Sequence, residues 1–311
     1  MDIQTKNQPI VSVRLMTYNH AEFIKEAMDG IMKQRTNFPV EVVVGDDFST
    51  DDTLKIIHSY NDTDNIKIKI LNRKIGDNYW QKRQKLGRLY NFTNILDNCK
   101  GKYIALLDGD DYWTDPNKLQ KQVDFLEENH DYSLVFHNRF VLDLNGNLTK
   151  GPLKIKAQSI PQNKMISTMA PTLTMVFRND IDEFKELDLS GIFSGDVAIR
   201  AFLSTKGKAY SFPYFWAVYR QHSGGICSSK DFETNSLLWI KTRDIIEKKI
   251  DGIDIRDLNL SKFMILMELM IFYLKNKKYH KILYFTPKLV RAYFLSKEFH
   301  FPINKIFYKN N

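Results

Sequence analysis

The chain contains little of what marks disulfide-rich or repetitive proteins. Two cysteines, Cys99 and Cys227, stand among 311 residues without a metal-ligand spacing. We therefore do not expect a disulfide scaffold. Two cysteines without such spacing are more typical of a protein in the reducing cytoplasm. Glycine and proline are sparse, and no low-complexity tract or internal repeat is present. The length allows one large domain or two small ones.

Long apolar runs are also missing. The best candidate for a membrane span, residues 263–274, is short and is interrupted by Glu268, so no bilayer-crossing segment is expected. Residues 1–8 are polar and lack the apolar centre of a signal peptide. We expect a cytoplasmic protein, and a peripheral position on the cytoplasmic face of the inner membrane is the alternative.

Several catalytic motifs are absent as well. The sequence has no Gly-x-x-x-x-Gly-Lys phosphate loop, no Gly-x-Gly-x-x-Gly, and no Ser-His-Asp or Cys-His arrangement. The hydrophobic fraction of 43% and charged fraction of 26% are those of an ordinary globular protein with a core. The net charge of +8 suits nucleic acid, anionic lipid or phosphorylated ligands without choosing among them.

The first ~115 residues alternate strand and helix patterns, which predicts an α/β fold with a mainly parallel sheet. The first predicted helix follows Asn19, a candidate cap paired with Glu22. A later helix is expected to start at Pro116, capped by Asp115. The predicted strands of this half cover residues 10–15, 40–44, 66–71 and 103–107.

The second half predicts fewer regular elements and a helical end. We expect a helix over 118–128, strands over 133–141, 172–177 and 209–212, a helix over 197–204, and an irregular polar stretch over 145–170. From residue 232 the pattern is helical, basic and aromatic. The predicted domains are 1–230, divided near 115 into nucleotide-binding and acceptor-binding halves, and an appended helical region, 231–311.

Acidic residues gather where the fourth predicted strand ends. Asp108, Asp110 and Asp111 follow the buried pattern of residues 103–107. Carboxylates this close repel one another, and hard divalent ions such as Mg²⁺ or Mn²⁺ prefer oxygen ligands. The pattern indicates a metal–phosphate site, and the alternative is a solvated acidic turn.

Two other polar clusters end predicted strands. Thr17, Tyr18 and Asn19 follow the first strand, and Asp46 and Asp47 follow the second. Each cluster alone is weak evidence, because strand-to-helix turns favour such residues as caps. In doubly wound sheets, however, ligands bind outside the carboxyl ends of the strands, so their joint placement favours a binding edge.

Together, the segments 11–19, 42–51 and 101–113 resemble family 2 glycosyltransferases of the GT-A fold. The resemblance covers roughly residues 9–228 and implies a Rossmann-like sheet flanked by helices. It implies that Thr17, Tyr18 and Asn19 line the nucleotide pocket and that Asp46 or Asp47 bonds the base. It matches the Asp-x-Asp element to Asp108, Gly109 and Asp110, with Asp110 and Asp111 favoured as metal ligands.

The resemblance also assigns roles further along the chain. Asp196 would be the catalytic base, the alternatives being that it only caps a helix or that Asp180 or Asp182, which lack a matching motif, is the base. Arg220 would contact phosphate, and His222 would bind metal or phosphate, next to the Gly224–Gly225 pair that suits a mobile lid. In the basic stretch that includes Lys82, Arg83 and Arg88, Arg88 is a candidate contact to the nucleotide, and a solvated helix face is the alternative.

The resulting prediction is an inverting, metal-dependent hexosyl-type glycosyltransferase. It would move sugar from a nucleotide sugar, UDP-linked by resemblance, to a glycan or lipid-linked acceptor of capsule or lipopolysaccharide synthesis. The basic, aromatic C-terminal helices suit a membrane contact or serve packing or oligomer assembly. The alternatives are a soluble or protein acceptor, or a non-catalytic nucleotide-, carbohydrate- or nucleic-acid-binding protein. Nucleic acid is not expected, because the acidic edge would repel it.

Overall fold

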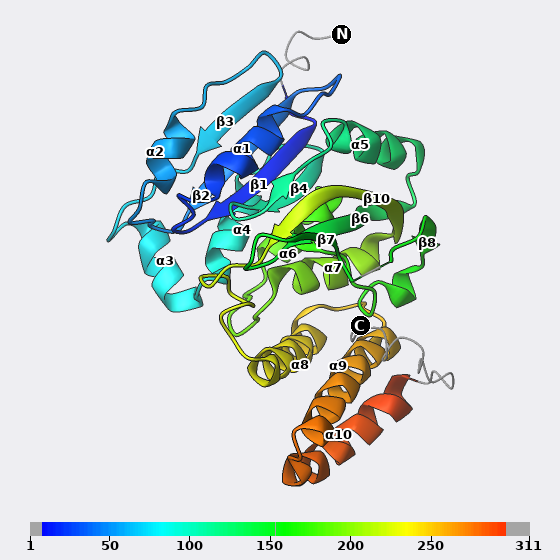
Figure 1. Cartoon of the computed structure of the whole chain (residues 1–311). Helices are drawn as coiled ribbons and strands as arrows, with labels where there is room; N and C mark the ends of the chain where they lie inside the picture. The colour runs from blue at the N-terminus through cyan, green and yellow to red at the C-terminus, as the bar shows by residue number, and fades with distance from the viewer. Residues whose placement is uncertain (1–7, 153, 297–311) are drawn as a thin grey trace. The chain divides into compact units, whose positions relative to one another are not determined.

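The computed structural model describes residues 8–152 and 154–296 and divides into two compact units (Figure 1). The first unit contains the described residues of Met1–Ser159, Ala170–Ser190 and Lys208–Gln221. The second contains those of Ile160–Met169, Gly191–Gly207 and His222–Asn311. The chain therefore enters the second unit three times, and the helix that carries Asp196 belongs to it.

The first unit is built on one mixed sheet in the order β3-β2-β1-β4-β9-β6-β10-β5. The first four of these strands are parallel, as predicted. β9 then pairs antiparallel with both β4 and β6, and β10 runs parallel to β6. The strands are β1 (Val11–Thr17), β2 (Val40–Asp46), β3 (Ile66–Ile70), β4 (Tyr103–Asp108), β5 (Tyr112–Trp113), β6 (Tyr132–Leu142), β7 (Leu148–Lys150), β8 (Gln158–Ile160), β9 (Val176–Arg178) and β10 (Lys208–Arg220).

The helices of the first unit cover both faces of this sheet. They are α1 (Ile24–Met32), α2 (Thr53–His58), α3 (Asn78–Leu86), α4 (Leu89–Asp97), α5 (Lys118–Glu128) and α6 (Asp182–Lys185). On β1, Val13 and Leu15 pack with the apolar stripe of α1, whose period of three to four residues fits an amphipathic helix. The alternate residue Arg14 lies 4.8 Å from the ring centre of Phe92 on α4. The predicted α/β class, with helices flanking a central sheet, is confirmed.

Several predicted boundaries were wrong, each for a local reason. Asn19 does not cap α1, which begins at Ile24; its side chain accepts a hydrogen bond from Thr50 N instead. The predicted bounds of α5, 118–128, are confirmed, but Asp115 is not its N-cap and Pro116 is not in the helix, because the Asp115 carboxylate accepts from Asn117 N in a turn before it. The predicted strand 172–177 is a 3₁₀ turn, η3 (Thr172–Thr174), followed by β9. The irregular stretch 145–170 contains β7, β8 and η2 (Gln162–Lys164).

The second unit is helical. α7 (Gly195–Lys206) is followed by α8 (Phe232–Lys249), α9 (Ile255–Lys275) and α10 (Tyr279–Ser296). The Asp231 and Asp254 carboxylates cap α8 and α9 by accepting backbone N–H groups. An apolar cluster joins α9 and α10 and includes Leu269, Tyr273 and Phe285.

The helical pattern predicted from residue 232 is confirmed as far as residue 296. The predicted basic and aromatic residues Lys297, Lys305 and Phe307 lie outside the described residues. In residues 8–152 and 154–296, no helix combines the length and apolar character needed to cross a membrane.

Candidate functional site

The loops after β1 and β2 are joined by side-chain hydrogen bonds. Asn19 N donates to Ser49 Oγ at 2.8 Å, and Asn19 Oδ1 accepts from Thr50 N at 2.8 Å. Asp51 Oδ2 accepts from Ala21 N at 3.0 Å. Asn19 has a φ of 53°, in a left-handed region that asparagine tolerates better than most residues. These contacts make one rigid rim of the predicted pocket.

The two carboxylates at the end of β2 have different partners. Asp46 is buried, and its oxygens accept from Ser49 N at 2.8 Å and Ser49 Oγ at 2.5 Å. Burial raises the pKa of Asp46, and the bonds from Ser49 oppose that rise. Asp47 instead contacts two residues of α3: Arg83 Nη2 lies 2.8 Å from Asp47 Oδ2, and Tyr79 Oη donates to Asp47 Oδ1 at 3.0 Å. Asp46 thus holds its own turn, whereas Asp47 faces a polar and aromatic cluster.

That cluster is aromatic and cationic. The guanidinium of Arg73 lies 3.7 Å from the ring centre of Tyr79, and Tyr90 stacks on Tyr79 at 5.4 Å. Phe48 borders Tyr79 at 5.8 Å and adopts a φ of 66°. A bulky residue in that left-handed region costs roughly 1–2 kcal/mol, so the tight turn after β2 is retained against local strain. Tyr79 is buried in this cluster, whereas Phe48 is half-buried and directly follows Asp47.

The carboxylates after β4 are only partly compensated. Asp108 Oδ1 pairs with Arg14 Nη1 at 2.7 Å, and the Arg14 side chain is completely buried. Asp111 is buried and accepts from Arg220 N at 2.9 Å. Asp110 Oδ2 lies 3.9 Å from His20 Nε2. The three carboxylates therefore lie within one short turn, with Arg14 beside Asp108 and His20 beside Asp110.

The electrostatics of these carboxylates fit a bound cation. Burial, and then the Asp110 carboxylate beside it, raise the pKa of Asp111 well above its usual value. Burial also raises the pKa of Asp108, although Arg14 opposes the rise. Oxygen ligands with mutual repulsion are the donor set that Mg²⁺ and Mn²⁺ prefer. The residues present therefore fit a hard divalent ion.

Gly109 lets the β4 end approach the loop after β1. A Cβ at this position would lie 2.9 Å from His20 Nδ1, 2.9 Å from Ile24 Cδ1 and 3.0 Å from Thr17 Oγ1. Gly109 N also donates to Met16 O at 2.8 Å. The absence of a side chain is a packing requirement here, and it brings the acidic turn against Thr17 and His20.

The end of β10 completes this edge of the first unit. Arg220 N holds Asp111, Arg220 Nε donates to Asp110 O at 3.2 Å, and the Arg220 guanidinium pairs with Glu26. His222 comes two residues later, in the second unit, where its carbonyl accepts from Gly225 N at 3.1 Å. Arg220 therefore positions the acidic turn through its own backbone.

Asp196 lies in the first turn of α7, after the N-cap position Ser194. Asp196 Oδ1 accepts from Val197 N at 2.9 Å, so the carboxylate bonds the helix backbone without being its N-cap. Within the same unit, the buried guanidinium groups of Arg200 and Arg243 both feel its charge, while burial lowers the pKa of each arginine. The surroundings of Asp196 are thus cationic.

Two other predicted site residues, Tyr18 and Arg88, are at least partly exposed to solvent. Tyr18 is 54% exposed. Arg88 immediately precedes α4 and is half-buried. The basic side chain that contacts Asp47 is Arg83. From the sequence, Arg83 was named only as part of a basic stretch, and Arg88 was chosen as the candidate contact. Arg14 was missed altogether, although a charged residue inside an apolar strand signals a buried counter-ion.

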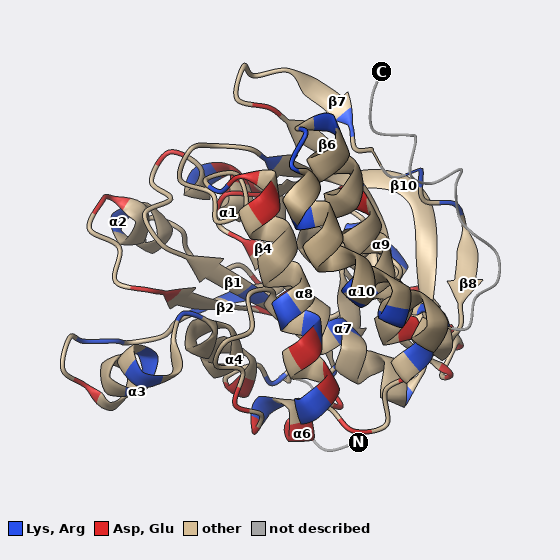
Figure 2. Ribbon diagram, turned by 90° about the horizontal axis from the view of Figure 1, so that it is seen from below, with Lys and Arg blue, Asp and Glu red and all other residues tan. Residues whose placement is uncertain are grey.

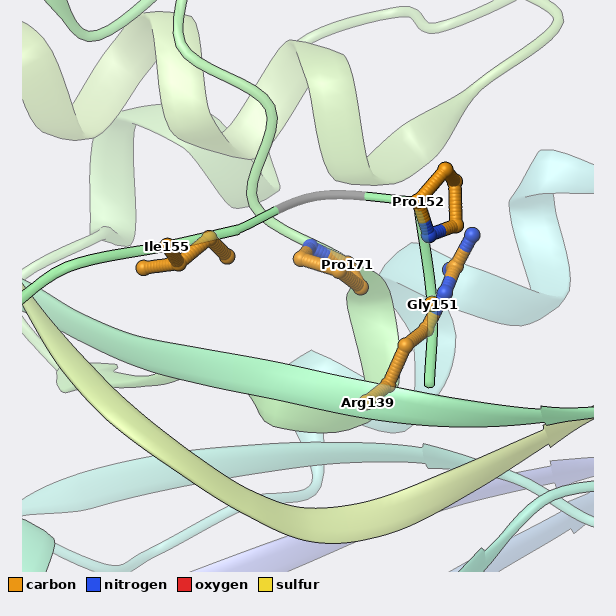
Figure 3. A pocket seen from close by; sticks show the side chains of 5 residues that line it. All are labelled: Arg139, Gly151, Pro152, Ile155 and Pro171. Carbon is orange, nitrogen blue, oxygen red and sulfur yellow. The ribbon is translucent and has the colours of Figure 1, made fainter. Parts of the chain in front are cut away.

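Two hollows lie elsewhere in the first unit. One is lined by Arg139, Gly151, Pro152, Ile155 and Pro171 (Figure 3). The other, of about 170 Å³, lies between α4 and residues 185–190 and includes Tyr90 and Asp97. Neither is lined by the strand-end carboxylates, so they do not displace that edge as the candidate site.

The model of the family described as Glycosyl transferase family 2 matches residues 12–184, more than half of the chain. The chain belongs to this family. Uncharacterised proteins of Mycobacterium bovis and Mycobacterium tuberculosis are 32% identical to it over 221 residues, covering 70% of this chain and 61% of each relative. The match therefore spans less than two thirds of those relatives.

Solved structures share the fold of this family 2 chain. S. aureus TarS in complex with UDP-GlcNAc aligns with a TM-score of 0.60 and 21% identity, over 91% of this chain and 79% of that one. A mannosyltransferase from Pyrobaculum calidifontis, in complex with GDP-Man and Mn²⁺, aligns with a TM-score of 0.55 and 16% identity, over 97% and 88%. The family match includes all three strand-end clusters, whereas Asp196, Arg220 and His222 lie beyond it.

Proposed function

We propose that this chain is an inverting glycosyltransferase that uses a nucleotide sugar. The observation that carries the proposal is the edge formed by Asp47 and the Asp108–Asp111 turn, at the ends of parallel strands of a family 2 domain. One part of the edge borders an aromatic cluster, and the other brings three carboxylates together. One solved structure with a similar fold contains UDP-GlcNAc, and another contains GDP-Man and Mn²⁺. These complexes support a nucleotide-sugar donor.

Asp47 is the proposed contact to the base, in preference to Asp46. Asp46 is buried and bonded within its own turn by Ser49. The Asp47 side chain is 13% exposed, although its oxygens also accept from Tyr79 and Arg83. The half-buried ring of Phe48 adjoins Asp47, so a base stacked there could also donate a ring N–H to the carboxylate. A uracil base, and hence a UDP-sugar, fits this acceptor. Arg83 would hold the carboxylate in place.

Asp110 and Asp111 would hold Mg²⁺ or Mn²⁺, and His222 is a further proposed ligand. The ion would neutralise charge that develops on the departing diphosphate. The chain's own contribution is to fix the carboxylates, through Gly109 and the backbone of Arg220. Thr17, Tyr18 and Asn19 would border the nucleotide, with Arg88 as a more distant contact.

Asp196 is the proposed catalytic base. An acceptor hydroxyl must lose its proton as it attacks the anomeric carbon, and a carboxylate can take it. The guanidinium groups of Arg200 and Arg243 interact electrostatically with Asp196 within the same unit. A single attack assisted by one base inverts the anomeric centre.

The proposed acceptor is a hydroxyl of a glycan on a lipid carrier, as in capsule or lipopolysaccharide synthesis, with the C-terminal helices at the membrane surface. Those helices carry several exposed aromatic and basic side chains, including Tyr284 and Lys288, which supports this choice. A soluble or protein acceptor is the second candidate.

Thermal unfolding with nucleotides tests the proposal. The protein is heated with UDP, GDP, CDP or dTDP, each with Mn²⁺ and again with EDTA, because ligands that bind the native state raise its apparent stability. We expect a shift with UDP that needs Mn²⁺. A shift with another nucleotide would overturn the uracil assignment, and no shift with any would favour a non-catalytic binding protein.

A further inference from the structure

Helix α10 is apolar on two faces. One face is buried against α9 and includes Phe285 and Ala292. The other is exposed: Tyr279 is 60% exposed, Leu283 76% and Phe294 69%. A helix that only packs on its neighbour needs one apolar stripe and turns a polar face to solvent. The second stripe of α10 is therefore not explained by the packing of the unit.

The exposed residues form a continuous stripe. Tyr279, Leu283, Pro287, Val290 and Phe294 follow one another at intervals of three or four residues, so they share one side of the helix. Single exposed apolar residues are ordinary on protein surfaces, whereas contiguous ones mark an interaction site. The stripe extends along almost the whole of α10.

The charged residues of α10 itself all have one sign. Residues 269–296 contain no Asp or Glu, and within them Lys288 and Arg291 are exposed on α10. Lys278 and Lys281 pair with Glu233 of α8. Arg291 directly follows Val290 at the edge of the stripe, and Lys288 lies further round the helix, with its Nζ over the rings of Tyr284 and Phe285. Figure 2 shows both signs of charge on α8, whereas α10 has only cationic residues. An anionic surface complements this combination.

Two other occupants fit less well. A second copy would bring the same cations together, and like charges across an interface oppose association. A bilayer crossing is not available, because no described helix is long and apolar enough. A helix with an apolar side and flanking cations instead lies in the plane of a membrane interface.

We propose that α10 docks its exposed stripe into an anionic lipid surface, with Lys288 and Arg291 against the headgroups. This inference rests on the lipid-linked acceptor proposed above and names the surface that would bring the enzyme to it. Tyr284, which is 64% exposed and lies under Lys288 at 4.8 Å, suits the interfacial depth, where aromatic rings are favoured.

Vesicle flotation of the full chain tests the proposal. The vesicles are phosphatidylcholine alone, or phosphatidylcholine mixed with phosphatidylglycerol. We expect binding only to the mixed vesicles, weakened by salt. Lys288→Glu with Arg291→Glu should weaken it at least about tenfold, and Leu283→Ser with Phe294→Ser should do the same. Leu144→Ser, a site 70% exposed in the first unit, and Lys55→Glu are the matched controls.

The outcomes separate this inference from the proposed function. Equal binding to both vesicle types, or unchanged binding by both α10 variants, would overturn the membrane assignment. So would a wild-type dimer that ignores vesicles and dissociates in the Leu283→Ser, Phe294→Ser variant, because the stripe would then be a self-interface. The UDP-dependent thermal shift tests the proposed function separately. If the shift is retained in a protein that does not bind vesicles, only the membrane inference is wrong. If the protein binds vesicles but shows no shift, only the proposed function is wrong.

Discussion

The ends of β2 and β4 carry acidic residues at the same edge of one sheet, yet they are compensated differently. At β2, Asp46 is bonded by Ser49, and Asp47 is paired with Arg83 and Tyr79. At β4, Asp108 pairs with Arg14, and the pKa of Asp111 is raised by burial and by Asp110. The first arrangement suits a neutral base, and the second suits a cation. The predictions below separate these two chemistries.

The largest expected effect is at β4. Asp111→Asn keeps an oxygen for Arg220 N but removes a charge, so metal-dependent donor binding should vanish and transfer should fall about 10²–10³-fold. In EDTA the same variant should unfold at a higher temperature than wild type, because the like-charge repulsion is relieved. Calorimetric unfolding with and without Mn²⁺ measures both effects.

Asp131→Asn is the matched control for that variant. Its carboxylate pairs with Lys208 on the surface of the first unit, where ion pairs contribute little. Donor binding and transfer should therefore be unchanged. Metal-dependent binding that persists in Asp111→Asn would remove this residue from the ligand set.

Arg14 is expected to matter most for stability. Arg14→Met leaves the half-buried Asp108 without its counter-ion, and the loss should be about 3 kcal/mol, the lower end of the range for buried pairs. Denaturant unfolding measures the loss. Adding Asp108→Asn should recover most of it, because no unpaired charge then remains. If the double variant is as unstable as the single one, Arg14 acts through packing on Phe92 instead.

Asp257 offers a third type of acidic site, in which one buried carboxylate is bonded by backbone N–H groups. It is buried in the second unit and accepts from Ile166 N at 2.7 Å and Ser167 N at 3.2 Å. Burial raises its pKa to about 6, opposed by these bonds and by Arg200. Because the folded state holds the proton more tightly than the unfolded chain, stability should fall as pH rises from about 4 to about 6.

The size of this pH effect is about 3 kcal/mol. Unfolding free energies measured across that window, for wild type and Asp257→Asn, give the contribution of this one group. The variant should show a smaller decline. Identical pH profiles would mean that Asp257 has an ordinary pKa and that other carboxylates cause the decline.

The smallest predicted effect is at β2. Arg83→Met removes the partner of Asp47 and should weaken UDP binding by about tenfold, through loss of one charge-assisted contact. Binding should remain dependent on Mn²⁺, which distinguishes this end from β4. Lys82→Met, an exposed neighbour on α3, is the control. Loss of metal dependence in Arg83→Met would show that the two ends act as one unit.

Much of the catalytic architecture could be read from the sequence because it is local. Apolar runs predict β1 to β4, and the polar residues directly after three of them mark a common edge, since parallel strands present their carboxyl ends together. The helical region after residue 232 follows from its periodicity. Short elements were harder: η3 and β9 share one apolar run, and only pairing with β4 and β6 separates them.

The sequence by itself determined the α/β class, the family and the three acidic or polar clusters, because strand period and strand-end residues are properties of neighbouring positions. The tertiary structure decided how those clusters are used. Asp46 and Asp47 are chemically identical, and only the folds of the β2 turn and of α3 give one to Ser49 and the other to Arg83. The pairing of Arg14 with Asp108 joins positions 94 residues apart. The exposed stripe of α10 likewise depends on which side α9 covers. Partners distant in sequence, and the water excluded between them, set the charge and exposure of each side chain.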